Sequence, residues 1–391
     1  MRPDLLQRLA ARQRERAAAQ LLRRLRVLDV DAGAEGAWVV DAGRRLLDFA
    51  SNDYLGLARH PALVEALGRA ARTCGVGAGA AHLLGGHRAE HEALEARLAQ
   101  WLGRDRVLLF STGYMANLGV LAGLLERDDL CVQDKLNHAS LIDGARLAGC
   151  TLRRYRHADV EGAARQLDAQ PQAAALLASD GVFSMDGDLA PLAELAQLCT
   201  NRGALCMVDD AHGLGVLGHD GGGSLAVAGL GQREVPVLMG TLGKALGTFG
   251  AFVAGSAGLI EGLVQQARPF VYTTALPPAL AAATCVAVDL ARGDAARRAT
   301  LAARIAQFRA GAHARGLPVL DSSSAIQPLR VGGSAAALAA SARLREAGFH
   351  VPAVRPPTVP QGQARLRITL SALHAPTQVE QLLDALRSVL A

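Results

Sequence analysis

LCMVDDAHGLGVLGHDGGGSLAVAGLGQREVPVLMGTLGKALGTFG, residues 205–250 of this 391-residue chain, decides the fold. Two short apolar runs in it, 205–208 and 235–239, have the length and hydrophobicity of strands that are buried in a sheet. The first run leads into Asp209, and the second leads into a small-residue turn that contains Lys244. In an open α/β sheet, the carboxyl ends of neighbouring strands meet at one edge and form the usual ligand crevice. The stretch therefore predicts a site in which a carboxylate and an amine lie together.

Lysine is rare in this chain, and that rarity draws attention to Lys244. Only two of the 41 lysine and arginine residues are lysines, Lys135 and Lys244. Arginine stays protonated in proteins, whereas a lysine amine becomes a nucleophile once burial or a neighbouring cation lowers its pKa. An amine, the Asp209 carboxylate and the His212 imidazole match the aldehyde, ring nitrogen and phenolic oxygen of pyridoxal 5′-phosphate (PLP). PLP is therefore the predicted cofactor. The alternative, a solvated loop lysine and a turn-forming aspartate, accounts for each residue alone but poorly for both together.

Composition narrows the class of protein. A chain of 391 residues exceeds the roughly 250–300 residues at which one hydrophobic core stops growing, so two domains are expected. No run of about 18 apolar residues occurs, which argues against a membrane span. The net charge of +5 comes from scattered arginines, and aromatic residues make up only 4%, so nucleic-acid binding is not supported. Six cysteines without a C-x-x-C motif, a metal-ligand pattern or a secretory leader predict reduced thiols in a cytoplasmic protein: Cys74, Cys131, Cys150, Cys199, Cys206 and Cys285.

The chain up to residue 255 alternates short apolar runs with loops and helical patterns. An amphipathic helix is expected at 87–102, and buried strands are expected at 107–110, 130–133 and 174–178. Such alternation predicts an α/β fold with a mostly parallel sheet that helices cover on both faces. Towards the C-terminus, the pattern predicts helical structure followed by a closing strand and helix, at 281–314, 365–370 and 376–390.

The segment STGYMAN, residues 111–117, follows a predicted strand and opens a helix. Hydroxyl groups and Gly113 at the start of a helix present backbone N–H groups and the positive end of the helix dipole, which together favour a phosphate. Capping of the helix by Ser111 or Thr112 is an alternative that is compatible with phosphate binding. The glycine-rich loop at 75–86 is a weaker phosphate candidate, because it matches neither the P-loop nor the dinucleotide fingerprint.

The N-terminal region contains two further features. Residues 1–26 combine apolar positions at helical spacing with many arginines, which predicts an arm helix packed on the body of the protein. A transit peptide is disfavoured because the segment carries Asp4 and Glu15. A hairpin-like stretch at 36–48 then leads to 50–57, where polar side chains between apolar ones are typical of a loop that lines a site.

Eight blocks of sequence, in order, resemble those of the α-oxoamine synthases, PLP enzymes of fold type I that join an amino acid to an acyl thioester and release carbon dioxide. The resemblance runs from the arm helix to residue 370. It implies an N-terminal arm at 1–49, a large PLP-binding domain at 50–285 and a small C-terminal α/β domain at 286–391, in a homodimer with active sites at the interface. The blocks are SNDYLGL (51–57), STGYMAN (111–117), NHASLIDGARL (137–147), DGVFSMDGDLAPL (180–192), VDDAHGLGVLG (208–218), TLGKALG (241–247), YTTALPP (272–278) and RPPTVPQGQARLRITLSALH (355–374).

The resemblance also implies roles for the residues that match. Lys244 is expected to bind PLP covalently and then to act as the base at the α-carbon of the amino acid, while Asp209 is expected to pair with the ring nitrogen. His138 matches a histidine that stacks on the cofactor ring. The other expected cofactor contacts are Ser184 and His212 near the phenolic oxygen, Gly113 and Tyr114 at the helix start, Thr241 at the phosphate, and Thr273 or Thr274 from the partner subunit.

Substrate contacts are implied at four positions. Arg23 and Thr358 match substrate-contacting positions, and Asn52 and Arg355 lie in the blocks that hold the substrate carboxylate, a group that arginine can grip at two points. Two other arginines, Arg24 and Arg26, compete with Arg23 for its role.

The implied substrates are L-alanine and a pimeloyl thioester, carried either by CoA or by an acyl carrier protein. Family members that use glycine and a shorter acyl group share the PLP residues and stay an alternative, although RPPTVP at 355–360 favours the first pair. An aminotransferase or a lyase is disfavoured by the full set of blocks. A non-catalytic protein of this fold is disfavoured by the intact His138, Asp209 and Lys244, and no metal is expected.

Overall fold

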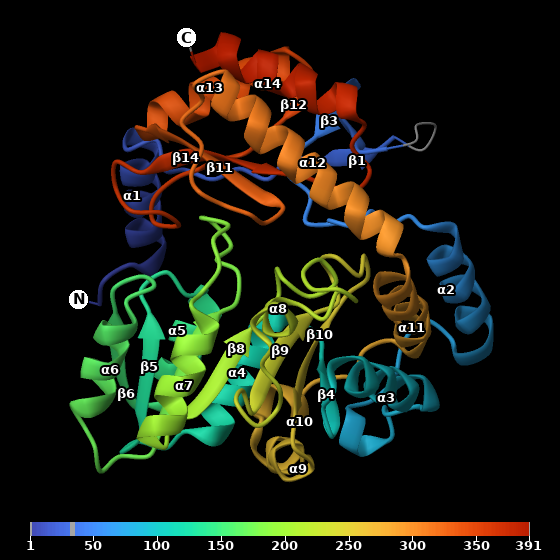
Figure 1. The fold of residues 1–391 in the computed structure, drawn as a ribbon, viewed down its shortest axis with the longest axis vertical. Coiled ribbons are helices and arrows are strands. Elements are labelled where there is room, and N and C mark those ends of the chain that lie inside the picture. The colour runs from blue at the N-terminus through green and yellow to red at the C-terminus, as the bar shows by residue number, and fades with distance from the viewer. Residues whose placement is uncertain (1, 32–35, 391) are drawn as a thin grey trace. The chain divides into compact units, whose positions relative to one another are not determined.

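The computed structural model describes residues 2–31 and 36–390, and the contacts within it divide the chain into two compact units. The larger unit comprises Asn52–Ser184 and Asp188–Thr300. The other comprises the residues up to Ser51, the short insertion Met185–Gly187, and Leu301 onward. Figure 1 follows the chain through both units by colour. The division after Thr300 falls inside a helix, and the domain boundaries expected at 49/50 and 285/286 stay predictions.

A seven-stranded sheet forms the centre of the larger unit, with the strand order β4-β10-β9-β8-β7-β5-β6. Strands β6, β5, β7, β8 and β9 run parallel, and β10 pairs antiparallel with both β9 and β4. The predicted mostly parallel sheet is therefore confirmed. The strand bounds are β4 (Arg106–Phe110), β5 (Leu130–Asp134), β6 (Thr151–Tyr155), β7 (Ala175–Asp180), β8 (Leu205–Asp209), β9 (Val237–Thr241) and β10 (Ala251–Gly255).

Helices cover this sheet on both faces, as expected. Alternate strand residues such as Leu176 and Met207 pack with apolar side chains of α4, α5, α9 and α10 in one core cluster, while α6 and α7 contact the strands but do not contribute to that cluster. Right-handed crossovers explain this arrangement. The chain moves along the sheet in one direction from β5 to β6 and in the opposite direction from β6 to β7 and β8, so the connecting helices lie on opposite faces. The helices of the unit are α2 (Pro61–Cys74), α3 (Ala89–Leu102), α4 (Gly113–Leu124), α5 (Ala139–Ala148), α6 (Val160–Asp168), α7 (Leu192–Arg202), α8 (Ser224–Ala228), α9 (Ala257–Gln266), α10 (Arg268–Val271) and α11 (Pro278–Gly293).

The smaller unit is built around two small sheets. One has the order β1-β2-β3-β12 and contains the predicted hairpin, and the other has the order β11-β14-β13 and contains the predicted closing strand. The strands are β1 (Leu28–Val30), β2 (Trp38–Asp41), β3 (Arg44–Asp48), β11 (Ile326–Gly332), β12 (Phe349–His350), β13 (Ala353–Val354) and β14 (Ala364–Thr369). Its helices are α1 (Leu5–Ala18), α13 (Ser334–Glu346) and α14 (Pro376–Leu390), together with the later part of α12 (Ala295–Ala314).

Two expectations about helices change in the structure. The helical stretch expected at 281–314 is two helices, α11 and α12, which break at Asp294, where the Asp294 side chain accepts a hydrogen bond from the amide of Arg297. The arm helix α1 forms, with the Asp4 side chain capping its N-terminus, but none of its residues is buried. Its leucines at positions 5, 6 and 9 are exposed, so α1 is not packed on the body within the described chain.

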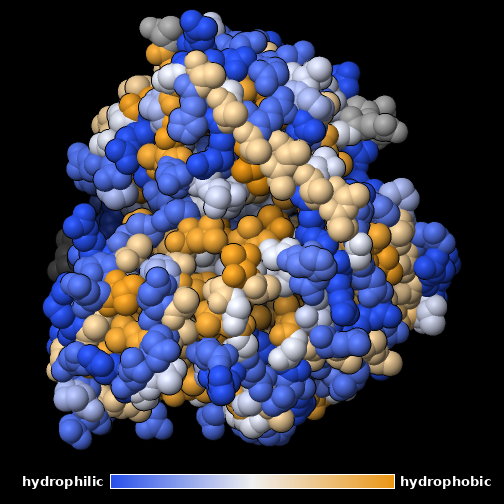
Figure 2. All heavy atoms as spheres, in the orientation of Figure 1, coloured by the Kyte–Doolittle hydropathy of each residue, from blue (hydrophilic) through white to orange (hydrophobic). Residues whose placement is uncertain are grey.

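The molecular surface and the state of the cysteines are those that the composition predicts. Figure 2 shows mainly hydrophilic side chains on the face drawn, with apolar patches between them, as is usual for a folded protein. All six cysteines are free thiols. Among the described residues, no helix is both long enough and apolar enough to traverse a membrane.

Gly247, in the turn that follows Lys244, lies in a tightly packed part of the fold. Gly247 has φ +65°, and a Cβ added there would lie 2.3 Å from the backbone nitrogen of Ala58. Gly149 has a similar φ of +76°, but a Cβ added at this position would meet no atom of the described residues within 4 Å. We expect Gly149→Ala to destabilise the protein by about 1 kcal/mol through backbone strain alone, and Gly247→Ala to destabilise it by at least about 2 kcal/mol. Thermal unfolding of both variants checks this, and equal midpoints would show that the contact with Ala58 relaxes without penalty.

Candidate active site

A cavity of about 200 Å³ lies at the carboxyl edge of the large sheet, entirely within the larger unit. The ends of β7, β8 and β9 and the starts of α4 and α5 contribute to it, which is the edge where open α/β sheets bind ligands. Eight of the predicted site residues line it. The full lining is Gly113, Tyr114, Asn117, His138, Ser140, Asp180, Val182, Ser184, Asp209, Ala211, His212, Met239, Thr241 and Lys244.

The Lys244 amine is held by a chain of side chains. Its Nζ lies 3.1 Å from Nε2 of His212, and Nδ1 of the same imidazole lies 2.5 Å from the hydroxyl of Tyr54. The Tyr54 hydroxyl also lies 3.2 Å from Oδ1 of Asn52. The segment 50–57 thus contacts His212, which lines the cavity, but none of the segment's own residues lines it, and its role at the site stays a prediction.

Asp209 is buried at the end of β8 and is positioned by hydrogen bonds. Its carboxylate accepts from Nδ2 of Asn117 at 2.7 Å and from the amide of Ala211 at 3.1 Å. Asn117 in turn donates to the Ser140 hydroxyl at 2.8 Å. A buried carboxylate that accepts hydrogen bonds from both sides is held in one orientation.

Two further carboxylates are buried beside Asp209. Burial, followed by the charge of Asp209, raises the pKa of Asp180 well above its usual range. Burial likewise raises the pKa of Asp210 to about 7, although Asp210 accepts a hydrogen bond from the amide of Ser224 at 2.7 Å. Burial also lowers the pKa of His138, whose amide donates to Asp180 at 3.1 Å. Two of these three carboxyl groups, Asp180 and Asp209, line the cavity, where a cationic ring nitrogen would find an acidic partner.

The start of α4, where an anion site was expected, lies at the cavity. The side chain of Thr112 caps the helix and accepts from the amide of Met115 at 3.2 Å, so the capping alternative is correct for Thr112. The other amides of the first turn have no partner within the helix itself. A Cβ at Gly113 would lie 2.8 Å from Cγ2 of Thr241, so glycine is needed where the helix start approaches β9. An amine, a buried carboxylate, two imidazoles and a helix N-terminus around one cavity fit PLP.

Apart from Asn52, which contacts Tyr54, the predicted residues outside the cavity fall into two groups. Thr273 and Thr274 belong to the larger unit but do not line the cavity, and Thr274 forms an isolated β-bridge with Ala81. Their assignment to the site of a partner subunit stays a prediction.

The predicted substrate arginines lie in the smaller unit, where Arg23 and Arg355 link the segments 20–23 and 355–358 to each other. Arg23 donates to the Thr358 hydroxyl at 2.9 Å, and Arg355 donates to the backbone carbonyls of Gln20 and Leu22. Of the two arginines that compete with Arg23, Arg26 is paired with Asp41 at 3.2 Å. The structure thus brings Arg23, Arg355 and Thr358 together, and their contacts with substrate stay predictions.

Four lining or supporting residues were not assigned roles from the sequence: Tyr54, Asn117, Ser140 and Asp180. Asn117 lies four residues after Gly113 and so shares its face of the helix, a spacing that could have indicated it. Asp180 ends a buried strand in the same way as Asp209. Tyr54 had no such signal, because its partner His212 lies 158 residues away in sequence.

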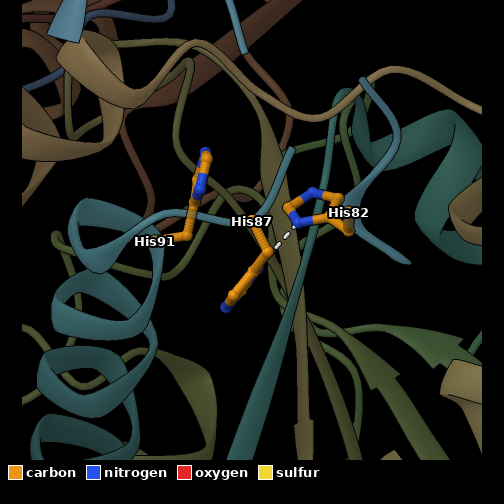
Figure 3. A group of neighbouring side chains, drawn as sticks. All are labelled: His82, His87 and His91. Atoms are coloured by element: carbon orange, nitrogen blue, oxygen red, sulfur yellow. Dashed lines mark hydrogen bonds between the residues drawn. The ribbon is translucent and has the colours of Figure 1, made fainter. Parts of the chain in front are cut away.

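Three histidines form a separate cluster that does not line this cavity (Figure 3). Nδ1 of His82 lies 2.8 Å from Nδ1 of His87, whose Nε2 lies 2.9 Å from a carboxylate oxygen of Glu92. His91 uses both nitrogens: Nδ1 accepts from the amide of Arg88, and Nε2 bonds to the carbonyl of Leu276. Because His91 is saturated by backbone groups, we interpret the cluster as a structural link between the 75–86 segment and α3.

Comparison with known proteins agrees with this geometry. The family model for class I and II aminotransferases matches residues 44–386. An 8-amino-7-oxononanoate synthase from Xanthomonas campestris is 54% identical over 98% of this chain and 96% of its own length. Another from Alkalilimnicola ehrlichii is 56% identical over 96% of this chain and 95% of its own.

The solved structures agree with the sequence relatives. A serine palmitoyltransferase from S. paucimobilis with a bound PLP–myriocin aldimine superposes with a TM-score of 0.93 at 27% identity, covering 99% of this chain and 98% of that one. The matches span nearly the full length of both chains, so they apply to both units described here. The chain belongs to the class I and II aminotransferase family and, within it, to the PLP-dependent α-oxoamine synthases of fold type I.

Proposed function

We propose that this enzyme condenses L-alanine with a pimeloyl thioester and releases 8-amino-7-oxononanoate, carbon dioxide and the thiol. The observation that carries this choice is that relatives more than half identical over nearly the whole chain are 8-amino-7-oxononanoate synthases. The cavity supports the chemistry, because Lys244 and Asp209 line it together with an anion-binding helix start.

Each cavity residue has one proposed task toward the cofactor. When bound, PLP supplies an electron-withdrawing ring that stabilises negative charge on the α-carbon of the amino acid. Lys244 would hold the aldehyde, and Asp209 would hold the ring nitrogen in its protonated form. The remaining contacts are His138 on the ring face, Ser184 and His212 at the phenolic oxygen, and Gly113, Tyr114 and Thr241 at the phosphate.

Lys244 is also the proposed base that removes the α-proton of alanine. A positioned acid or base contributes about 10²–10⁴-fold to a rate. Of the two lysines in the chain, Lys244 is the one that lines the cavity, and Nε2 of His212 at 3.1 Å fixes the position of its amine. Burial lowers the pKa of His138, which favours the neutral form of this imidazole beside Lys244.

Four residues are proposed to contact substrate, Asn52 of the larger unit and Arg23, Arg355 and Thr358 of the smaller one. Arg355 and Asn52 would hold the alanine carboxylate, since a guanidinium binds a carboxylate at two points. Arg23 and Thr358, which are hydrogen-bonded to one another, would contact the substrate as a pair. Holding the amino acid and the thioester together can contribute about 7–11 kcal/mol to the reaction.

The proposal also covers the oligomeric state, the carrier of the acyl group and the cellular compartment. Thr273 or Thr274 would complete the site of the other subunit, which makes the working enzyme a homodimer. The acyl chain would arrive on CoA or on an acyl carrier protein. The six free thiols fit a reducing compartment, and we assign the enzyme to the cytoplasm.

Turnover with defined substrate pairs tests the proposed reaction. The enzyme should release the thiol from pimeloyl-CoA with L-alanine at least about tenfold faster, in kcat/KM, than with glycine, because the methyl group is worth about 1–3 kcal/mol in a fitted pocket. Acetyl-CoA and succinyl-CoA serve as the short-chain comparisons. Turnover with glycine and a short acyl group alone would replace the proposed substrates with those of the glycine-using members and leave the family unchanged.

The two lysines provide a matched test of the covalent role. Lys244→Ala and Lys244→Arg should both lose the absorbance of enzyme-bound PLP above about 400 nm and should lose activity, because neither side chain offers a nucleophilic amine. Lys135 is exposed, and Lys135→Ala should keep both properties. An absorption spectrum and a condensation assay of the three variants show whether Lys244 is the residue that binds PLP covalently. Wild-type colour in Lys244→Ala would rule out the assigned attachment point.

Replacement of the Asp209 carboxylate tests its proposed role of keeping the ring nitrogen of PLP protonated. Asp209→Asn keeps the shape of the side chain but removes the charge that would hold a proton on the ring nitrogen. We expect kcat to fall by about 100-fold or more, with the PLP content of the purified protein largely retained. Single-turnover rates and cofactor content give the two values. A variant with wild-type kcat would show that the charge of Asp209 has no part in the chemistry.

A further inference from the structure

The threonine loop, residues 272–274, follows α10 in the larger unit and has buried flanks. It contains the two threonines that the proposed function assigns to the site of a partner subunit, one of them exposed and the other half-buried. Tyr272 in this loop is 72% exposed, whereas Phe270 before it and Leu276 after it are only 4% and 2% exposed. The contacts of the flanks therefore set the position of the threonine loop.

The segment 80–91, which precedes and begins α3, holds the threonine loop at both ends. After the loop, the amide of Ala275 donates to the carbonyl of Ala80 at 3.0 Å. Before the loop, the ring of His82 stacks on the ring of Phe270, with centroids 4.8 Å apart and planes 20° apart. The segment 80–91 and the flanks of the threonine loop therefore form one packed structure within a single subunit.

His91 adds a third contact, and backbone groups alone fix the proton on its ring. Its Nδ1 accepts from the amide of Arg88 at 2.9 Å, a bond that belongs to the cap of α3, and its Nε2 lies 2.6 Å from the carbonyl of Leu276. A backbone amide only donates and a carbonyl only accepts, so Nε2 carries the proton and donates it to Leu276. The ring is 0% exposed, so water does not compete for either bond. His91 is therefore a rigid bridge from the start of α3 to the end of the threonine loop.

We propose that His91 is a positioning residue for the partner subunit: its hydrogen bond to the carbonyl of Leu276 fixes the threonine loop, so that Thr273 or Thr274 can complete the PLP site of the other chain. This inference rests on the proposed function, which supplies the homodimer and the role of the two threonines. His91 does not line the cavity of its own subunit, so its effect on PLP binding passes through the loop and falls on the site across the interface.

Two substitutions separate the two hydrogen bonds of His91. In His91→Asn, the side-chain amide ends where Nδ1 lies, so it can still accept from the amide of Arg88 but does not reach Leu276. In His91→Gln, the amide nitrogen occupies the position of Nε2 and can still donate to Leu276. If His91 only caps α3, the asparagine variant is the milder change. If it acts through the threonine loop, the glutamine variant is the milder one.

Mixed dimers, purified through a different tag on each subunit, show which site His91 serves. In the first dimer one subunit carries Lys244→Ala and His91→Asn and the other is wild type, so the intact PLP site faces the altered loop. PLP titration, followed by the absorbance above about 400 nm, should give a dissociation constant about tenfold higher than with Lys244→Ala alone, the size expected for loss of one hydrogen bond to a charged group. In the second dimer the two substitutions are on different subunits, the intact site faces a wild-type loop, and the dissociation constant should not change.

His87→Ala is the matched control, because His87 belongs to the same cluster (Figure 3) but forms its hydrogen bonds with His82 and Glu92. In place of His91→Asn in the first dimer, it should leave the dissociation constant unchanged. Hydrogen exchange of the protein without PLP tests the loop itself: the Ala275 amide should exchange faster in His91→Asn and as in the wild type in His91→Gln. Thermal unfolding of the variants shows whether either change affects the whole fold.

Threonine variants separate this inference from the proposed function. A first dimer that carries Thr273→Val and Thr274→Val in place of His91→Asn should also bind PLP more weakly. If it binds like the wild type, the proposed contact between subunits is wrong and the role of His91 falls with it. If the threonines matter but His91→Asn has no effect, or weakens binding equally in both mixed dimers or only in the second, the role of His91 is wrong and the proposed function stands. Weak binding by His91→Gln in the first dimer would overturn it as well, even if His91→Asn fails to fold.

Discussion

Buried negative charge at the carboxyl edge of the large sheet is the constraint on which the rest of the site depends. Asp180, Asp209 and Asp210 each lie almost completely out of water, and an isolated carboxylate in such a place is strongly destabilised. The fold supplies each of them with donors: Asn117 and backbone amides at Asp209, the amide of Ser224 at Asp210, and the amide of His138 at Asp180. Burial nevertheless raises the pKa of Asp180 and of Asp210, while Asn117 positions the Asp209 carboxylate in the cavity. A protonated ring nitrogen would complete this arrangement.

The sheet topology explains why these groups meet. Parallel strands β7, β8 and β9 end at the same edge, so residues far apart in sequence arrive side by side without a dedicated loop. The antiparallel strand β10 sits between β9 and β4, and the chain leaves β4 at that edge to start α4 directly at Gly113. The helix start can come this close to β9 because Gly113 has no side chain to meet Thr241. The course of the backbone thus brings the expected anion site and the Asp209 carboxylate to the same cavity.

Most of the fold and the centre of the site could be predicted from the sequence, because apolar runs that end in polar residues carry that information locally. Lys244, Asp209, His212 and His138 were identified in this way or through the resemblance, and the structure brings them to one cavity. The direction of β10, the role of Asn117 and the contact between Tyr54 and His212 depend on pairings across the fold that no local pattern records. The arm helix was expected to pack on the body, but none of its residues is buried within the described chain.

The chain of hydrogen bonds from Asn52 to Lys244 connects two roles that are usually described apart. Asn52 is proposed to contact the substrate carboxylate, and Lys244 is proposed to remove the α-proton, with Tyr54 and His212 between them. A base at position 244 has to gain and lose a proton during the reaction. Arginine could not do so, since its guanidinium keeps its proton throughout. The proposed reaction therefore needs a lysine at this position, in a chain that has only two lysines.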